Sequence, residues 1–354
     1  MEKIVLVTGG AGYIGSTTTK LLQQYDYKTI TLDNLSSGTR DLNKSDFFYE
    51  GSISNEKLLE KIFSTFEITA VLHFAASSLV EESVQNPKKY YENNVVGTIK
   101  LLEKMLEFNV KKIIFSSSAS VYGKPKKIPI REKTKTKPLN PYGRTKFFIE
   151  EILKDYHTAY GLSSISLRYF NACGTEKDLE VGEVHTPETH LIPLLVRAAL
   201  ENKPISINGR DYETYDGTCI RDYIHVSDLA NAHLKALNYL EKKEACLRIN
   251  LANEQGFSIL EIIQALEKIL GKKIQIKNSP RRPGDPAILI GKNETAEKIL
   301  GWKTQITNIE EIIKTAYNWQ CSNRFKELTA LIDKNPSISS SILKKNQTEQ
   351  QEFY

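Results

Sequence analysis

A tyrosine and a lysine four residues apart form the clearest catalytic pair in the sequence. Tyr142 and Lys146 follow Pro141, which favours the first turn of a helix, and a spacing of four places both side chains on one helical face. A neighbouring ammonium group stabilises phenolate and lowers the pKa of a tyrosine from about 10 towards neutral pH. The pair therefore predicts that Tyr142 is a general base and that Lys146 tunes its pKa.

The same spacing occurs at two other places, which we interpret as structural. Pro125 breaks the helical spacing between Tyr122 and Lys126. The second pair, Tyr239 and Lys243, lies at the polar end of a predicted helix, where a solvated face is the simpler interpretation.

A serine-rich segment lies upstream of the tyrosine, at the end of a predicted parallel strand. Ligand sites of open α/β sheets lie beyond the carboxyl ends of their strands, so a serine there can hydrogen-bond both a phenol and a substrate hydroxyl. Capping of neighbouring backbone explains Ser116 and Ser120 adequately. We assign the catalytic role to Ser118, partly on the family resemblance described below.

A glycine-rich segment follows the first predicted strand and opens a helix. It reads Thr8-Gly-Gly-Ala-Gly-Tyr-Ile-Gly15 and fits Gly-x-Gly-x-x-Gly from Gly10 and Gly-x-x-Gly-x-x-Gly from Gly9. Glycine permits a tight turn and close backbone approach to a pyrophosphate, and the helix N-terminus supplies free N–H groups. A glycine-rich turn without a ligand is the alternative, but the flanking strand and helix favour a dinucleotide site.

An acidic residue at the end of the second predicted strand supports the same site. Asp33 lies 18 residues after Gly15, where a carboxylate can accept hydrogen bonds from an adenosine ribose. Its charge would repel a 2′-phosphate, which favours NAD over NADP. An Asp that starts a turn with Asn34 is a compatible second interpretation.

Strands and helices alternate through the first half of the chain, which predicts right-handed crossovers and a parallel sheet. Several strands are apolar throughout, as expected when helices cover both sheet faces. The fold class is therefore α/β, a Rossmann-type doubly wound parallel sheet with a smaller C-terminal α/β substrate domain. The predicted strands are 4–8, 28–32, 70–74, 112–116, 164–168 and 247–251, and the predicted helices are 88–109, 142–160, 188–202, 228–240, 258–270 and 309–319.

Three regions are expected from this pattern. Residues 1–170 form an NAD-binding Rossmann domain, to which the chain returns at about 222–252. Residues 171–330 form a discontinuous second domain, which the family resemblance described below implies binds a UDP-sugar. Residues 331–354 are polar and lack periodicity, which predicts a flexible tail.

Composition excludes several classes of protein. The chain has 354 residues, 40% of them hydrophobic and 26% charged, as in folded water-soluble proteins, and no apolar run approaches the roughly 20 residues of a membrane span. The net charge of +5 comes from scattered lysines and arginines, so we expect no nucleic-acid partner. Four cysteines without Cys-x-x-Cys spacing indicate reduced thiols in a cytoplasm, and six histidines without a His-x-x-x-His pair predict no metal site.

The order of these motifs carries a family resemblance. The chain resembles the extended short-chain dehydrogenase/reductase superfamily and, within it, the UDP-glucose 4-epimerase (UDP-galactose 4-epimerase) family, from about residue 1 to 319. Besides the segments above, the motifs are His73-Phe-Ala-Ala76, Tyr91-Glu-Asn-Asn94, Asn140-Pro-Tyr-Gly-Arg-Thr-Lys146, Leu167-Arg-Tyr-Phe-Asn171, Asp216-Gly-Thr-Cys-Ile-Arg-Asp-Tyr-Ile-His-Val226 and Arg281-Arg-Pro-Gly-Asp285.

The resemblance implies an isomerase that inverts C4 of a UDP-hexose with tightly held NAD, through a transient 4-keto sugar. The implied catalytic residues are Tyr142, Lys146 and Ser118. The implied cofactor positions are Gly9, Gly12, Tyr13, Ile14, Gly15, Asp33, Asn34, Phe74, Ala75, Asn93, Tyr142, Lys146 and Phe170. The implied substrate positions are Ser118, Asn171, His190, Leu191, Arg221, Arg282, Asp285 and Leu289.

Four positions depart from the family pattern. Ser52 and Ser78 stand where relatives commonly carry an Asp and a Lys near the cofactor, which weakens the expected retention of NAD. Asn208 replaces an apolar or aromatic residue near the uracil. Leu289 stands where bulk limits the group at C2 of the sugar, and its intermediate size leaves UDP-N-acetylhexosamines open as substrates.

Other activities of the superfamily fit less well. A sugar-nucleotide 4,6-dehydratase would carry an Asp-Glu pair where this chain has Ala119 and Ser120. A UDP-glucuronate decarboxylase or epimerase would need a carboxylate pocket that the sequence does not reveal. A non-catalytic NAD-sensing protein would not need all three catalytic residues. The family resemblance also predicts a homodimer that pairs the helices at 88–109 and 142–160.

Overall fold

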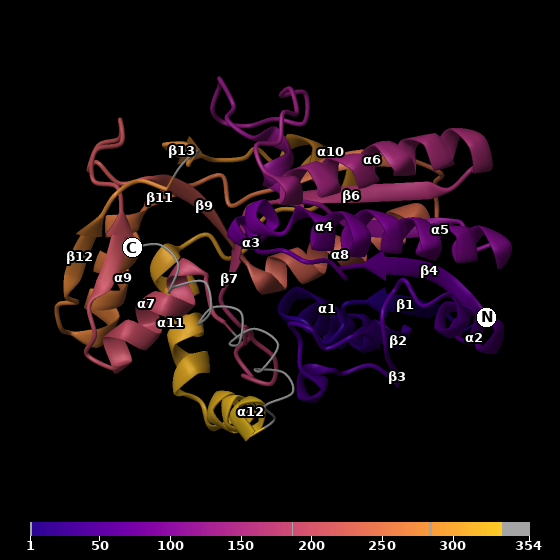
Figure 1. Cartoon of the computed structure of the whole chain (residues 1–354), viewed down its shortest axis with the longest axis horizontal. Helices are drawn as coiled ribbons and strands as arrows, with labels where there is room; N and C mark the ends of the chain where they lie inside the picture. Colours follow the sequence, from indigo (N-terminus) through magenta and orange to yellow (C-terminus); the bar gives the residue numbers. More distant parts are fainter. Residues whose placement is uncertain (1, 186, 283–284, 335–354) are drawn as a thin grey trace.

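A seven-stranded parallel sheet forms the larger unit of the protein, shown in Figure 1 by a computed structural model that describes residues 2–185, 187–282 and 285–334. The spatial order of its strands is β10-β6-β5-β4-β1-β2-β3. Their bounds are β1 (Ile4–Thr8), β2 (Lys28–Asp33), β3 (Phe47–Glu50), β4 (Ile68–His73), β5 (Lys112–Ser116), β6 (Ser163–Tyr169) and β10 (Cys246–Leu251).

Helices cover both faces of this sheet, so every residue of β1 is buried. One face packs against α1 (Tyr13–Gln24), α8 (Val226–Leu240) and α10 (Glu294–Leu300). The other face packs against α2 (Glu56–Thr65), α5 (Gly97–Glu107) and α6 (Pro141–Tyr160). The short helices α3 (Val80–Gln85) and α4 (Pro87–Tyr90) and a π-helical turn (Tyr91–Val96) lead into α5. This layering confirms the predicted doubly wound α/β fold.

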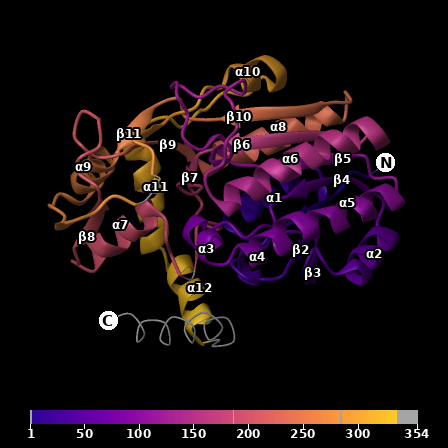
Figure 2. The ribbon, with the colours of Figure 1, turned by 45° about the horizontal axis from the view of Figure 1, so that its top comes forward.

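The smaller unit lies beside the large sheet in Figure 2, and its buried apolar residues form a separate core. Its helices are α7 (Leu191–Leu200), α9 (Ile259–Leu270) and α11 (Ile309–Cys321). One sheet contains β7 (Asn171–Cys173), β9 (Ile220–His225), β11 (Gly256–Ser258) and β13 (Ile288–Leu289), and another pairs β8 (Ile205–Asn208) with β12 (Ile276–Ser279). A capping box between Ser258 and Glu261 starts α9.

The chain crosses between the two units more than once. After β9 in the smaller sheet, α8 packs against α1 and β10 pairs with β6 in the large sheet. The return to the large sheet therefore begins at α8, a few residues after the predicted position of 222. Helix α12 (Asn323–Lys334) runs four residues into the predicted tail, and residues 335–354 lie outside the described part. Among the described residues, no helix combines the length and apolarity needed to cross a bilayer.

Candidate active site

The catalytic candidates meet where β5 ends and α6 begins. The Asn140 side chain accepts a hydrogen bond from the Gly143 N–H at 2.8 Å and so caps α6. Tyr142 lies in the first turn, and the buried Nζ of Lys146 lies 5.8 Å from the centroid of its ring. The same Nζ donates a hydrogen bond of 2.7 Å to the carbonyl of Ser116, which fixes the lysine against the strand end.

The protonation of the pair differs from the sequence-based prediction. Burial raises the pKa of the Tyr142 phenol, and a hydrogen bond with the Ser118 hydroxyl opposes that rise. Burial also lowers the pKa of Lys146 to about 7, although the charge of Glu150 raises it. The prediction that Lys146 lowers the tyrosine pKa was right about proximity. It was wrong about the direction of the Tyr142 pKa shift, which is upward because burial penalises the charged phenolate. Burial penalises the charged form of Lys146 as well.

A buried charge network lies beneath the pair, and sequence analysis missed it. Glu150 accepts hydrogen bonds from Ser117 Oγ at 2.6 Å and from Arg168 Nε at 2.8 Å. Glu150 and Arg168 side chains are 0% and 1% exposed. Since Ser117 precedes Ser118, the network fixes the backbone that carries the catalytic serine. The available signal was the spacing, because Glu150 follows Lys146 by another four residues on the same helical face.

Ser116 has a larger role than backbone capping. Its hydroxyl forms a short hydrogen bond with the hydroxyl of Tyr169, and its carbonyl holds Lys146. Tyr169 is buried beside the catalytic pair, and the negative charge of a Tyr142 phenolate contributes to raising its pKa. Tyr169 is therefore a second phenol near the site that sequence analysis did not select.

The two other Tyr-x-x-x-Lys pairs have structural surroundings. Tyr122 is buried and its hydroxyl bonds to the Asn250 side chain at 2.6 Å and to Arg168 at 2.9 Å. Tyr239 lies near the end of α8, with Lys243 Nζ 5.5 Å from its ring centroid. Both positions agree with the interpretation of these pairs as structural.

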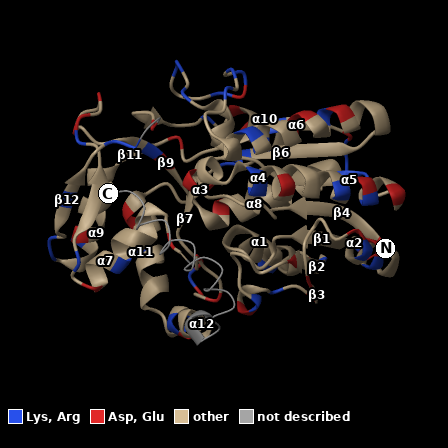
Figure 3. Cartoon of the chain, in the orientation of Figure 1, with Lys and Arg blue, Asp and Glu red and all other residues tan. Residues whose placement is uncertain are grey.

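A lysine-rich loop connects Ser118 to Tyr142, two of the catalytic candidates. Lys and Arg gather on this loop, at the top of Figure 3, between residues 124 and 137. Its middle is fixed to the smaller unit, because the Ile130 N–H donates to the carbonyl of Ile290 at 2.8 Å and the Lys292 N–H donates to the carbonyl of Ile130 at 3.0 Å. The loop thus couples the catalytic residues to the strand that carries Leu289.

The glycine-rich turn forms a cradle that suits a dinucleotide. Gly9 has a φ of +75°, and an added Cβ would lie 2.6 Å from the backbone nitrogen of Ala75. Gly12 begins α1 without a side-chain cap, which leaves N–H groups of the first turn for phosphate oxygens. Asp33 is buried and accepts N–H bonds from Ala11 at 3.0 Å and Leu35 at 2.8 Å. Its carboxylate keeps further acceptor capacity for a ribose hydroxyl, so these residues fit NAD.

The remaining cofactor candidates line the same end of the sheet. Tyr13 is buried in the first turn of α1 and donates to the carbonyl of Gly174, while Ile14 packs on the core of that sheet face. Phe74 follows β4, and its ring centroid lies 4.6 Å from that of His233. The Asn93 side chain donates to that of Asn94. Three further candidates also occupy this edge: Gly15, Asn34 and Phe170.

The candidate residues for UDP gather on the smaller sheet. Arg221 on β9 forms a short ion pair with Asp285 and donates to the carbonyl of Ile220 at 2.8 Å. Asn171 donates to the carbonyl of Asp222 at 2.8 Å. Arg282 is exposed, and in the described part of the chain no carboxylate lies within ion-pair distance of it. The neighbouring Arg281, by contrast, forms an ion pair with Asp211, with Nε 2.7 Å from Oδ1.

Leu289 links the substrate side to the catalytic side. It pairs in register with Arg221 between β13 and β9. Its side chain packs against a small buried cluster formed by Ala119, Val121, Tyr122 and Ile130. The cofactor candidate Phe170 packs against the same cluster. Leu191 begins α7 next to its N-cap residue His190, whose Nδ1 is turned towards Glu183.

Ser52 and Ser78, the two departures near the cofactor, add no charge. Ser52 forms a hydrogen bond with Ser54 at 2.8 Å, and Ser78 is exposed after β4. Asn208, the departure near the uracil, ends β8 opposite Ser279. A cofactor would thus meet fewer charged groups from this chain than the family pattern supplies.

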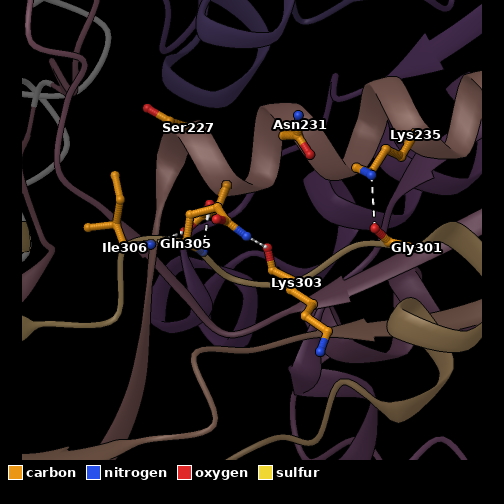
Figure 4. A pocket seen from close by; sticks show the side chains of 8 residues that line it. Ser227, Asn231, Lys235, Gly301, Lys303, Gln305 and Ile306 are labelled. Atoms are coloured by element: carbon orange, nitrogen blue, oxygen red, sulfur yellow. Dashed lines mark hydrogen bonds between the residues drawn. The ribbon is translucent and has the colours of Figure 1, made fainter.

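A cavity of about 520 Å³ lies elsewhere, between α8 and the segment at 301–306 (Figure 4). Its polar groups bond to one another, since Lys235 donates to the carbonyl of Gly301 at 2.9 Å and the carboxylate of Asp228 accepts the N–H groups of Gln305 and Ile306. None of the predicted site residues lines it. We therefore interpret this cavity as a gap left where α8 packs against the segment at 301–306.

Comparisons with known proteins agree with this geometry. Residues 5–252 match the family described as the NAD dependent epimerase/dehydratase family. A UDP-glucose 4-epimerase from Halalkalibacterium halodurans is 49% identical over 316 residues, which cover 89% of this chain and 95% of that protein.

Two solved structures are similar along nearly their whole length. UDP-glucose 4-epimerase from Brucella ovis in complex with NAD has a TM-score of 0.87 and 45% identity, covering 89% of this chain and 98% of that one. The enzyme from Bifidobacterium longum in complex with NAD⁺ and UDP has a TM-score of 0.87 and 41% identity, covering 91% and 99%.

Proposed function

The chain belongs to the NAD dependent epimerase/dehydratase family, and we propose that it interconverts UDP-glucose and UDP-galactose by inverting C4 of the hexose. The observation that carries the proposal is the meeting of Ser118, Tyr142 and Lys146 at the end of β5. A protein that only sensed NAD would not need this arrangement. The protein is thus an NAD-dependent isomerase.

Each catalytic residue has one task. Tyr142 removes the proton of the C4 hydroxyl, and Ser118, hydrogen-bonded to the phenol, holds the C4 oxygen. Lys146, fixed by the carbonyl of Ser116, holds the nicotinamide ribose. The protonated form of Lys146 also stabilises the phenolate of Tyr142. NAD, when bound, would supply the reversible hydride acceptor that oxidation and reduction at C4 require. Residues 9–15 and Asp33 would bind the pyrophosphate and the adenosine ribose.

We assign recognition of UDP to the smaller unit and of NAD to the larger one. Arg282 supplies a guanidinium group for the diphosphate, and Arg221 orients Asp285 towards the uridine ribose. Asn171, His190 and Leu191 are the other residues that we propose to contact the UDP. Leu289 from the smaller unit and Phe170 pack against one buried cluster that contains Ala119, which supports a sugar bound between the two units.

A second candidate activity is epimerisation of UDP-N-acetylglucosamine and UDP-N-acetylgalactosamine. The observation that favours it is Leu289, an aliphatic side chain on β13 where a large aromatic would exclude the N-acetyl group. Replacement of Leu289 by tyrosine should then reduce turnover of the N-acetylated sugar more than that of UDP-galactose.

We also propose a cytoplasmic homodimer. Val96 and Phe148 are exposed on the helices predicted to pair, and Tyr91 stacks on Phe148 with a centroid distance of 6.2 Å. An apolar stripe on two neighbouring helices supports association with a second copy. All four cysteines are free thiols, which supports a reducing compartment.

The test offers UDP-galactose, UDP-N-acetylglucosamine and UDP-glucuronate separately to the purified protein and identifies the products. We expect turnover of UDP-galactose without added oxidant. Tyr142→Phe should keep bound NAD but lose about 10²–10⁴-fold in kcat. The epimerase assignment is refuted if the protein converts neither UDP-galactose nor UDP-N-acetylglucosamine. Wild-type rates for Tyr142→Phe would show that another residue is the base.

A further inference from the structure

Two glutamates and two histidines converge in the segment between β7 and α7. Oε1 of Glu183 lies 2.8 Å from Nδ1 of His190 and 3.3 Å from Nδ1 of His185. The carboxylate of Glu188 lies 3.5 Å from His185 and 3.1 Å from His190. One ligand atom from each residue lies within 4.8 Å of all the others.

The two buried carboxylates of this cluster need positive charge beside them, which two imidazolium rings or one divalent metal ion would supply. The side chains of Glu183 and Glu188 are 7% and 2% exposed. Two buried carboxylates facing each other are costly unless a cation balances them. Nδ1 of His185 is buried and has no hydrogen-bond partner in the described residues, although it points into the cluster.

We propose that Glu183, His185, Glu188 and His190 bind one divalent transition-metal ion, with zinc as the best match. Two imidazoles and two carboxylates form a nitrogen and oxygen ligand set that zinc accepts. Four ligands at about 2.0–2.2 Å from a tetrahedral zinc lie roughly 3.3–3.6 Å from each other. The four imidazole-to-carboxylate separations of 2.8 to 3.5 Å lie near that range. Because the whole ligand set lies within 4.8 Å, side-chain shifts would bring all four atoms to one ion.

The site is structural because protein ligands fill all four positions. The carbonyl of Glu183 accepts a hydrogen bond from Trp319 Nε1 at 2.8 Å, which ties the cluster to α11. Glu188 also accepts the N–H of His190 at 2.8 Å, and His190 caps α7. A metal ion here would fix the start of α7, and with it Leu191, against α11.

Spacing alone could not reveal this site. A His-x-x-x-His pair marks two ligands on one helix, whereas His185 lies outside the helices and His190 is the N-cap residue of α7. The expectation of no metal site therefore rested on a pattern that does not apply to a loop. The proposal does not depend on the reaction that the protein catalyses.

The test measures metal content of the full-length protein. The protein is treated with a chelator, equilibrated with Zn²⁺, passed through gel filtration and analysed by mass spectrometry of the elements. We expect about one zinc per chain in the wild type and a loss of affinity of more than about 100-fold in Glu188→Gln and His185→Gln. His157→Gln is the matched control, because His157 lies on α6 outside the cluster. Bound NAD and circular dichroism report whether each variant is folded.

Two results would overturn the proposal. A wild type that retains no zinc would show a hydrogen-bonded cluster only, and equal zinc retention by both cluster variants would place the metal elsewhere. If neither variant folds, the visible absorption of the Co²⁺-loaded wild type decides. Strong bands of a four-coordinate site support the proposal, and the weak bands of a six-coordinate ion refute it.

Discussion

Replacement of Glu150 by glutamine would remove the negative charge from the buried network under the catalytic serine. Glutamine keeps the shape of the side chain and one carbonyl oxygen. It leaves the guanidinium of Arg168, which is 1% exposed, without a charged partner. The variant therefore isolates the charge of Glu150 from its packing.

The expected cost follows from burial. Loss of one partner of a buried ion pair typically costs about 3–5 kcal/mol, and the oxygen that glutamine retains places this variant near the lower end. The neighbouring Glu151 is the matched control, since it is 42% exposed and pairs with Arg248 at 2.6 Å. A partly exposed pair of this kind contributes less than about 1 kcal/mol, so Glu151→Gln should behave like the wild type.

The assay is urea unfolding followed by circular dichroism, with the NAD content measured in parallel. A second readout is the pH profile of kcat. Because the charge of Glu150 raises the pKa of Lys146, its removal should move the Lys146 limb of that profile to lower pH. A Glu150→Gln protein within about 1 kcal/mol of the wild type, or an equal loss in Glu151→Gln, would refute the reasoning.

Three further predictions concern the cofactor, the substrate and acid stability. Gly9→Ala should lose bound NAD, measured by absorbance of the released nucleotide, because the new Cβ meets Ala75. Arg282→Ala should raise KM for the UDP-sugar about ten- to a hundredfold, whereas Arg281→Ala should change it little. Burial lowers the pKa of His233 to about 4, so the unfolded chain takes up a proton there as pH falls from 6.5 to 4 and wild-type stability declines. His233→Phe should show a smaller decline than the wild type, by up to about 3 kcal/mol in urea unfolding at the two pH values, since the buried His73 and His225 still contribute.

Local patterns predicted the parts of the site that lie on single elements. The Tyr142 and Lys146 pair needs only helical spacing, and the glycine turn needs only a strand before it and a helix after it. The alternation of strands and helices predicted a parallel sheet and six of its seven strands, but not β3 or the helix α2.

Features that depend on distant segments could not be predicted in the same way. The sheet around β9 joins three strands of only two or three residues each, and such runs carry no periodicity. The pair of Glu150 and Arg168 forms only when α6 packs on β6, and the sign of the Tyr142 pKa shift depends on how deeply that packing buries the phenol.

The position of β10 at the edge of the large sheet has a consequence for biosynthesis. β10 pairs with β6 along the whole of Cys246–Leu251. A nascent chain that has emerged only as far as residue 170 therefore presents β6 as an open edge, which invites aggregation. The nucleotide-binding half cannot finish folding until the ribosome has released some eighty more residues, which include β10. The N-terminal half of this chain therefore cannot fold completely before the C-terminal half is synthesised.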